Sequence, residues 1–514
     1  MAINNLVKRL QNIMRQDAGI NGDAQRIEQM VWIMFLKVYD AQEEDWELDD
    51  DNYQSIIPEP LRWRNWAHSR DEEGRERNDA LTGDALLQFI DQTLFPVLKG
   101  NDSADGSIRG IRVSRDTARN KAIVHEVFSE VNQYMKNGTL LRQMINTIDE
   151  IDLLDSQESH AFGDIYEDIL KDLQNAGNAG EFYTPRALTD FIVEMLDPRL
   201  GEKFGDFAGG TAGFCVSAIK HLEKQKRTAE DEELFQQSII GQEWKPFPYL
   251  LAVTNLLLHG IKNPEYYHMD SLGVPMSEYH SEGKVDVIGM NPPYGGATDA
   301  STKQNFRQEF RSSETADLFL VLIMERLKRG GRAGVIVPDG FLFGTDGAKL
   351  AIKRRMLREF NLHTIIRLPG SIFNPYTSIA TNILFFNNER AEGAPEGYST
   401  AQTWFYRLDM PEGYKHFSKT KPMKVEHAQP IAQWWNDRKE IVSEDGTDEK
   451  SRAFTPAELE AMAMNFDQCK FPKESEEILE PNELLRQYHE KRAALDKKID
   501  ETLNEIEMML GVKL

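Results

Sequence analysis

The four residues Asn-Pro-Pro-Tyr at 291–294 have the types and spacing required to methylate a planar, conjugated amine. They follow residues 285–290, an apolar run that predicts a central strand, and the two prolines end strand pairing and stiffen the chain. The side-chain oxygen of Asn291 and the carbonyl of Pro292 can accept both amine hydrogens, which returns electron density to the nitrogen. Tyr294 offers a flat face for stacking a base. The alternative, a turn that merely ends a strand, needs neither the asparagine nor the aromatic residue.

A turn rich in small residues, Asp-Phe-Ala-Gly-Gly-Thr-Ala-Gly-Phe at 206–214, lies upstream between a predicted strand and a predicted helix. Small side chains let the backbone approach a ligand closely, and the first turn of a helix offers free amides to a charged group. The turn lacks the Gly-x-Gly-x-x-Gly pattern and a phosphate-binding lysine. By itself it therefore fits many nucleotide sites, or only a tight turn.

Two carboxylates follow the next predicted strands. Glu243 ends the strand after the glycine-rich turn, where a carboxylate can accept from both hydroxyls of a ribose. Asp270 follows the short segment 266–269, which would be a further strand end, and could accept from the amine of a bound adenine. The alternatives are a surface glutamate at a strand end and an Asp-Ser pair that begins a turn.

The region from about 182 to 386 alternates short apolar segments with helical ones, which predicts an α/β fold with an open, mostly parallel sheet and helices on both faces. Such sheets bind ligands at the carboxyl ends of their strands. We therefore expect the turn, Glu243 and Asn291 to meet at one edge. The expected strands are 204–207, 238–243, 285–290, 334–337, 364–368 and 382–386.

The flanking regions predict a helical N-terminal domain at 1–155, a central domain at 156–472 that contains the sheet, and a C-terminal helical tail at 473–514. The acidic stretch at 43–51 predicts a solvated loop. The tail has an apolar seam in alternating steps of three and four, which either packs on its own domain or forms a coiled coil with another chain. The seam consists of Leu485, Tyr488, Arg492, Leu495, Ile499, Thr502, Ile506 and Met509.

Composition predicts a protein of the cytoplasm without a membrane segment. The two cysteines, Cys215 and Cys469, cannot form a disulfide framework or a structural zinc site, and no metal is expected. The N-terminus shows no signal peptide, and the longest strongly apolar run, 30–36, is too short to span a membrane.

Together the motifs resemble those of the amino-methyltransferases of DNA, and specifically the modification (M) subunit of type I restriction-modification systems. Five further segments are similar to blocks of that family, so the resemblance covers most of the chain. The family often has Pro and Cys or Ala where Phe207 and Gly209 stand, and Gly where Ala212 stands, which changes packing more than chemistry. The segments are 180–186, 255–260, 316–319, 373–377 and 381–386.

The resemblance implies a Rossmann-like methyltransferase sheet that transfers a methyl group from S-adenosylmethionine to N6 of adenine in a specific DNA sequence. It implies that Asn291, Pro292 and Tyr294 handle an adenine flipped out of double-stranded DNA. The residues implied to bind the cofactor are Glu181, Phe182, Tyr183, Thr184, Pro185, Arg186, Asp206, Thr211, Ala212, Gly213, Glu243 and Asp270.

The net charge of −24 is unfavourable for DNA binding, because DNA affinity comes mainly from Lys and Arg at phosphates. Either basic residues gather in a cleft or a partner holds the DNA. The resemblance implies the second solution, with target recognition on a separate specificity (S) subunit, docked through the tail, and a restriction and translocase (R) subunit as a further partner. Lys303, Arg307 and Arg311 could approach phosphates or form an ordinary solvated loop.

Two other classes of function remain open from the sequence. The Asn-Pro-Pro-Tyr motif also suits methylation of a protein glutamine amide or of an RNA base, because those nitrogens are equally delocalised. A non-catalytic subunit that only binds the cofactor and supports a complex is the second class, and the intact Asn291 and Tyr294 argue against it.

Overall fold

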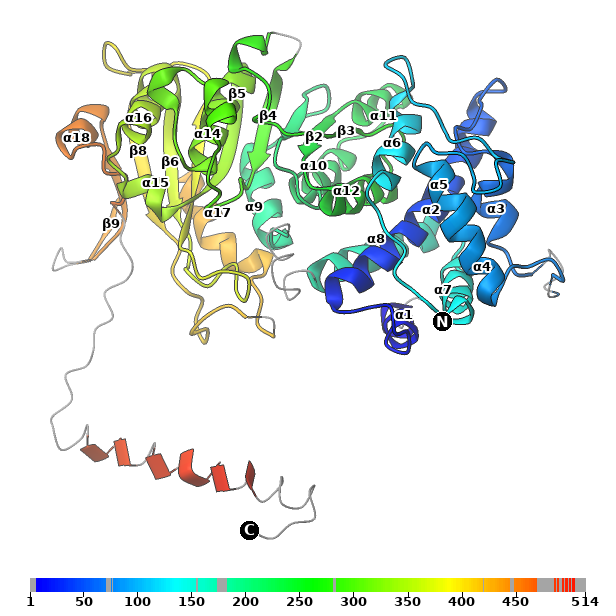
Figure 1. The fold of residues 1–514 in the computed structure, drawn as a ribbon. Coiled ribbons are helices and arrows are strands. Elements are labelled where there is room, and N and C mark those ends of the chain that lie inside the picture. The colour runs from blue at the N-terminus through cyan, green and yellow to red at the C-terminus, as the bar shows by residue number, and fades with distance from the viewer. Residues whose placement is uncertain are drawn as a thin grey trace. The chain divides into compact units, whose positions relative to one another are not determined.

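A computed structural model describes residues 6–70, 75, 77–153, 156–172, 183–280, 283–418, 420–443 and 448–468, together with parts of 485–503. The chain divides into two compact units, Met1–Lys470 and Phe471–Leu514 (Figure 1). The described residues of the second unit are helical. None of the described helices is both long and apolar enough to cross a membrane.

The described part of the first unit contains a ten-stranded sheet in the order β3-β2-β1-β4-β5-β7-β6-β8-β10-β9. Neighbouring strands from β3 to β5 are parallel, as the predicted α/β fold requires. Beyond β5 the sheet is mixed, since β7 is antiparallel to both β5 and β6, and β10 is antiparallel to β8 and β9. The strands are β1 Phe204–Asp206, β2 Ile239–Glu243, β3 Glu265–His268, β4 Val285–Met290, β5 Leu327–Pro338, β6 Asn361–Arg367, β7 Thr381–Asn387, β8 Thr403–Arg407, β9 Ile441–Val442 and β10 Glu449–Phe454.

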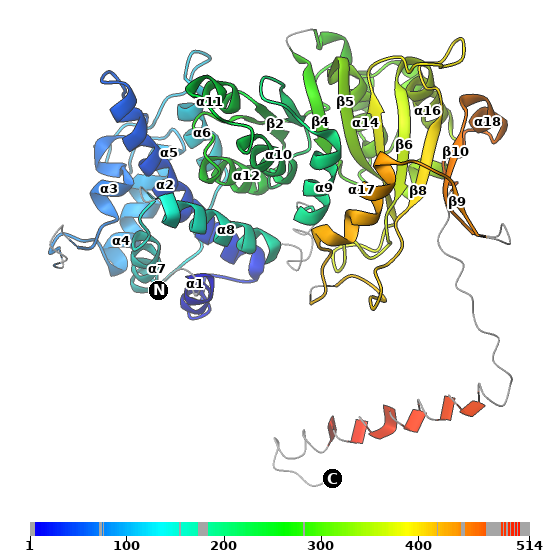
Figure 2. The same ribbon diagram turned by 180° about the vertical axis from the view of Figure 1, so that it is seen from behind.

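Both faces of the sheet are buried, each by its own hydrophobic core. Successive side chains of a strand point to opposite faces, so Val335 joins one core and Ile336 the other. Helices α9 and α17 cover one face and α14 and α16 the other, as comparison of Figures 1 and 2 shows. The helices of this region are α9 Arg186–Leu196, α10 Gly213–Glu223, α11 Ala229–Gln236, α12 Pro246–Leu258, α13 Ala300–Gln304, α14 Thr315–Arg326, α15 Asp339–Phe343, α16 Gly347–Glu359, α17 Gln429–Asn436 and α18 Pro456–Ala461.

The N-terminal region is helical, as predicted, and its core is continuous with that of α9, α10 and α12. Arg119 of α6 donates to the Tyr249 hydroxyl of α12 at 2.7 Å. The division at residues 155/156 remains a prediction. The helices are α1 Leu6–Met14, α2 Asp23–Asp49, α3 Trp63–Trp66, α4 Gly83–Phe89, α5 Phe95–Leu98, α6 Arg119–Phe128, α7 Gly138–Asp149 and α8 Ser156–Asp172, with a π-helix at Ile90–Leu94.

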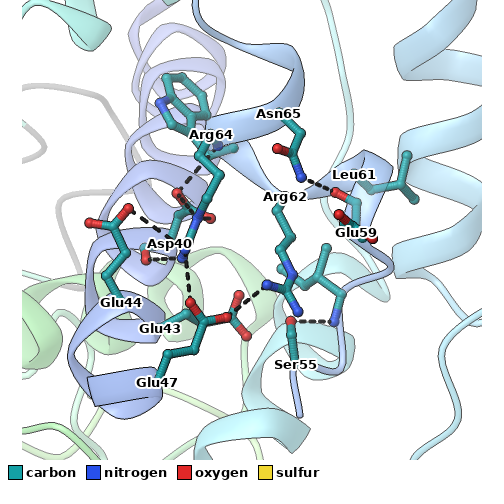
Figure 3. A network of polar contacts seen from close by, with 12 residues as sticks. Asp40, Glu43, Glu44, Glu47, Ser55, Glu59, Leu61, Arg62, Arg64 and Asn65 are labelled. Carbon is teal, nitrogen blue, oxygen red and sulfur yellow. Dashed lines mark hydrogen bonds and ion pairs between the residues drawn. The ribbon is translucent and has the colours of Figure 1, made fainter. Parts of the chain in front are cut away.

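The acidic stretch at 43–51 is mostly not the predicted solvated loop, because α2 continues to Asp49. Its carboxylates face two arginines of the following segment (Figure 3). Arg64 binds Asp40 at 3.1 Å and Glu47 at 2.9 Å, and Arg62 binds Glu47 at 2.7 Å. Glu43 is buried and accepts from the Tyr53 hydroxyl at 2.9 Å. The local charge pattern indicated solvent exposure, but Arg62 and Arg64, which neutralise these carboxylates, belong to the segment that follows α2.

Candidate active site

A small pocket opens at the carboxyl ends of the neighbouring parallel strands β1 and β4. From this pair the strand order proceeds to opposite sides of the sheet, through β2 and β3 on one side and β5 on the other, which is where such sheets bind ligands. This is the edge at which the sequence predicts the site. The pocket brings the glycine-rich turn together with Asn291, although more than 70 residues separate them. Its lining consists of Thr184, Asp206, Ala208, Gly209, Gly210, Thr211, Gly213, Phe214 and Asn291.

The turn needs small residues because the side chains of Tyr266 and Arg186 pack directly against its backbone. A Cβ at Gly209 would lie 1.9 Å from the Tyr266 hydroxyl oxygen, and one at Gly213 would lie 2.0 Å from an Arg186 guanidinium nitrogen. Ala212, the residue before α10, has a φ of 61°, a left-handed conformation that favours glycine. The turn is thus held in a shape that keeps its backbone close to the pocket.

The two carboxylates nearest the turn are buried and bind backbone amides. Glu243 accepts from the amide of Gly210 at 2.9 Å and from that of Lys245 at 2.7 Å. Asp206 accepts from the amide of Ala208 at 3.2 Å. Burial raises the pKa of Glu243 to about 7, and burial together with the neighbouring Glu243 charge raises the pKa of Asp206 to about 8. Both groups therefore exchange protons near neutral pH.

Asn291 stands at the tip of β4 with both ends of its amide bonded. Its Nδ2 donates to the Thr184 hydroxyl at 3.1 Å, and its Oδ1 accepts from the Tyr294 hydroxyl. The ring of Tyr294 meets that of Phe373 edge to face, with centroids 6.4 Å apart. The Asn291 oxygen is therefore oriented by the protein itself and accepts the tyrosine hydroxyl.

Comparison with known proteins gives the family. The model of the N-6 DNA Methylase family matches residues 157–477, and that of the HsdM N-terminal domain matches residues 3–148. The methylase subunit of the type I restriction enzyme EcoEI from Escherichia coli is 46% identical over 520 residues, which cover 100% of this chain and 99% of that protein. The chain belongs to the methylase subunits of type I restriction enzymes.

Further relatives agree with this assignment. The EcoKI methylase subunit of Escherichia coli strain K12 is 31% identical over 331 residues, which cover 60% of each protein. A solved chain from work on complex assembly and conformational transition of the type I R-M system is 31% identical with a TM-score of 0.77, covering 100% of this chain and 99% of that one. A modification subunit from Vibrio vulnificus YJ016 is 38% identical with a TM-score of 0.71, covering 89% and 93%. The predicted enzyme class, an N6-adenine DNA methyltransferase, is confirmed.

The methylase subunit carries a buried ionic network below the turn that the sequence did not reveal. Arg186 at the start of α9 donates to both carboxylate oxygens of Glu167 and, at 3.1 Å, to the Thr211 hydroxyl. Asn255 of α12 donates to Glu167 at 2.8 Å and to the Thr211 carbonyl at 3.0 Å. Burial opposes the charge on Arg186, but Glu167 outweighs it and the guanidinium pKa is raised. Arg186 therefore supports the turn through Thr211.

The remaining predicted site residues of the methylase subunit occupy varied places. Tyr183 is buried, and the guanidinium of Arg186 lies 4.9 Å from its ring centre. Pro185 directly precedes α9.

Asp270 accepts from the Leu272 amide at 2.9 Å, as in an ordinary turn, and it is not among the residues that line the pocket. Pro292 is buried beside Asn291, while Glu181 and Phe182 lie outside the described residues.

Proposed function

We propose that the pocket binds S-adenosylmethionine and that the methyl group passes to N6 of an adenine held by Asn291, Pro292 and Tyr294. One observation carries this proposal: the pocket joins a glycine-rich turn suited to a nucleoside with the amide suited to the acceptor amine. When bound, the cofactor supplies an electrophilic methyl group on a positively charged sulfur.

The polar groups of the pocket, together with Glu243, which does not line it but bonds to its lining residue Gly210, fit that cofactor. Each oxygen of Glu243 accepts one backbone amide and retains a lone pair for a ribose hydroxyl. Asp206 adds a second buried carboxyl, which in ionised form favours a cationic ligand. Thr184, Thr211 and Gly213 line the cavity, and Ala212 shapes its turn. Arg186 supports the turn through Thr211 and lies against the Tyr183 ring, and Pro185 directly precedes the helix that carries Arg186. Glu181, Phe182 and Asp270 remain cofactor contacts implied by resemblance.

At the acceptor side, Asn291 Oδ1 and the carbonyl of Pro292 accept the two amine hydrogens and so hold the nitrogen with its lone pair toward the donor methyl group. The Tyr294 hydroxyl leaves Asn291 Oδ1 when the amine arrives. Its ring then stacks on the extruded base, supported by the edge of Phe373. Thr184 keeps the Asn291 amide in the same orientation throughout.

Cofactor affinity is expected to rise roughly tenfold from pH 6 to pH 8. The raised pKa of Glu243, about 7, means that the empty site holds a proton at pH 6. Ribose hydroxyls and a sulfonium favour the carboxylate, so binding must release that proton, which is unfavourable at low pH. Calorimetry of S-adenosylmethionine in buffers of different ionisation enthalpy measures both the affinity and the released proton.

The control for the pH profile is Glu243→Gln, which keeps the shape but cannot ionise. Its affinity should be lower at pH 8 and its pH dependence weaker, with Asp206 left as the titrating group. An unchanged slope in Glu243→Gln would contradict the assignment of this residue to the cofactor.

We also propose that the chain is the catalytic part of an assembly in the cytoplasm, where double-stranded DNA is available to it. The specificity subunit would supply target recognition, and a restriction subunit would be a further partner. The net charge of −24 supports a need for a DNA-holding partner.

The apolar seam of the tail offers a face for another chain. Its residues Leu485, Tyr488, Leu495 and Ile499 are each more than half exposed. The proposed domains are 1–155, 156–472 and 473–514.

Deletion of Pro481–Leu514 is expected to abolish co-purification with the specificity subunit, because it removes the seam. Cofactor affinity should stay within about twofold, since the pocket lies in the first unit. Pull-down and calorimetry on the same preparation measure both quantities. Retention of the specificity subunit by the shortened chain would refute the docking role of the tail.

A further inference from the structure

Two large apolar side chains are exposed at the edge of the sheet that carries Asn291. Phe343 is 56% exposed and Ile379 is 45% exposed. β5 is the direct neighbour of β4, and Phe343 is the last residue of α15, the helix that follows β5. Ile379 precedes β7, whose first residue, Thr381, pairs with the last residue of β5. Both side chains therefore flank the end of β5, next to the strand that positions the catalytic amide.

The turn that displays Phe343 is fixed by a buried lysine. The Lys353 ammonium donates to the carbonyls of Leu342 at 2.6 Å and Gly344 at 2.9 Å, the two residues on either side of Phe343. Its third bond reaches the Met464 carbonyl at 2.9 Å. A lysine that only capped the end of α15 would bond to the last carbonyls of that helix. Lys353 instead bonds to the residues on both sides of the exposed Phe343. The phenyl ring is thus presented on a rigid support.

The same turn is tied to the loop that follows Tyr294. Lys349 donates to Glu314 at 2.8 Å and pairs with Asp346 at 3.2 Å, on the turn after Phe343. Thr315, the residue after Glu314, donates to the carbonyl of Gly296 at 2.8 Å. These bonds connect the Phe343 turn with the loop that begins at the catalytic motif.

The segment that ends at Ile379 is also connected to the Asn-Pro-Pro-Tyr motif at 291–294. The segment that ends at Ile379 contains Phe373, whose ring packs against Tyr294. The carbonyl of Ala380, the next residue, accepts from the Asp339 amide at 3.0 Å, at the start of α15. The segment of Ile379 thus contacts Tyr294 directly through Phe373, whereas the turn of Phe343 is linked to the loop after Tyr294 through Lys349, Glu314 and Thr315.

We propose that Phe343 and Ile379 enter the DNA duplex and occupy the space that the extruded adenine leaves. Flipping a base removes its stacking, and an apolar side chain inserted between base pairs restores part of that contact. Insertion requires an exposed apolar group on a rigid support at the edge of the sheet that receives the base. Phe343 and Ile379 are exposed, Lys353 fixes the turn of Phe343, and both residues flank the end of β5, the neighbour of β4. This inference rests on the proposed handling of a flipped adenine by Asn291 and Tyr294.

The test uses the complex of this chain with its specificity subunit and two duplexes that contain its methylation site. In one duplex the target adenine pairs with thymine, and in the other it lies opposite an abasic residue, which makes extrusion easy. For the variant with Phe343→Ala and Ile379→Ala, we expect kcat/KM to fall about 30-fold on the paired duplex and to stay within about threefold of wild type on the abasic one. With 2-aminopurine at the target position, the variant should show less fluorescence on binding.

The matched control is Val442→Ala on β9, which removes an apolar side chain of similar exposure, 43%, and should leave both rates unchanged. An equal loss on both duplexes, or no loss on the paired one, would overturn the proposal. Asn291→Ala distinguishes failure of this inference from failure of the proposed function. Its rate should fall about 1,000-fold on both duplexes, and a rate equal to that of wild type would refute the proposed base-handling role.

Discussion

Replacing Asn291 with alanine is expected to lower kcat by about 1,000-fold while the affinity for S-adenosylmethionine stays within about threefold. In the proposed mechanism the variant loses the oxygen that accepts an amine hydrogen in the transition state, and the Tyr294 hydroxyl loses its acceptor. The cofactor pocket keeps its remaining lining. Single-turnover methyl transfer to DNA, with cofactor binding measured separately, checks the expectation.

Asn291→Asp distinguishes the acceptor role from a merely structural one. It keeps oxygen acceptors but loses the Nδ2 bond to Thr184, so its rate should lie between those of wild type and the alanine variant. Asn436→Ala removes an exposed asparagine at the end of α17 and should have no effect. Equal activity of Asn291→Ala and wild type would exclude the proposed chemistry.

Substituting Glu167 with glutamine is expected to destabilise the protein by about 3–5 kcal/mol. The change is nearly isosteric, yet it leaves the Arg186 guanidinium, whose side chain is only 17% exposed, without its counter-charge. Arg186 also holds Thr211, so the glycine-rich turn should loosen and cofactor affinity should fall. Urea unfolding with and without S-adenosylmethionine measures both effects.

A surface ion pair provides the comparison for Glu167. Glu232 pairs with Lys226 at 2.9 Å, and its side chain is 47% exposed, so Glu232→Gln should change the stability by less than about 0.5 kcal/mol. If both glutamine variants unfolded at the same urea concentration as wild type, the ionic network would not support the turn.

The central sheet could be predicted from the sequence because its strands are buried on both faces. A run such as Val335, Ile336 and Val337 is apolar throughout, and it lies between two helical segments, which together indicate a parallel strand. The position of the site followed from the same pattern, since Glu243 and Asn291 each end a strand. Because the strands are parallel, residues at their carboxyl ends lie at the same edge of the sheet.

The rest of the site depends on partners that are distant in the sequence. Glu167 looks like any glutamate of an amphipathic helix, and only the fold shows that it faces Arg186. The carboxylates at 43–47 looked solvated, because the arginines that neutralise them belong to a later segment. Asp270 lies at a strand end like Glu243, but its side chain bonds to the amide two residues on. Local patterns locate strand ends, whereas side-chain direction is set by these contacts.

The most direct test of the central claim is mapping of modified bases by single-molecule sequencing in a host that carries this chain and its specificity subunit. We expect N6-methyladenine at one defined sequence, its complete loss when the chain is deleted, and the same loss when only Asn291→Ala is present. Persistence of that methylation in the Asn291→Ala strain, or modification of a different atom, would contradict the account.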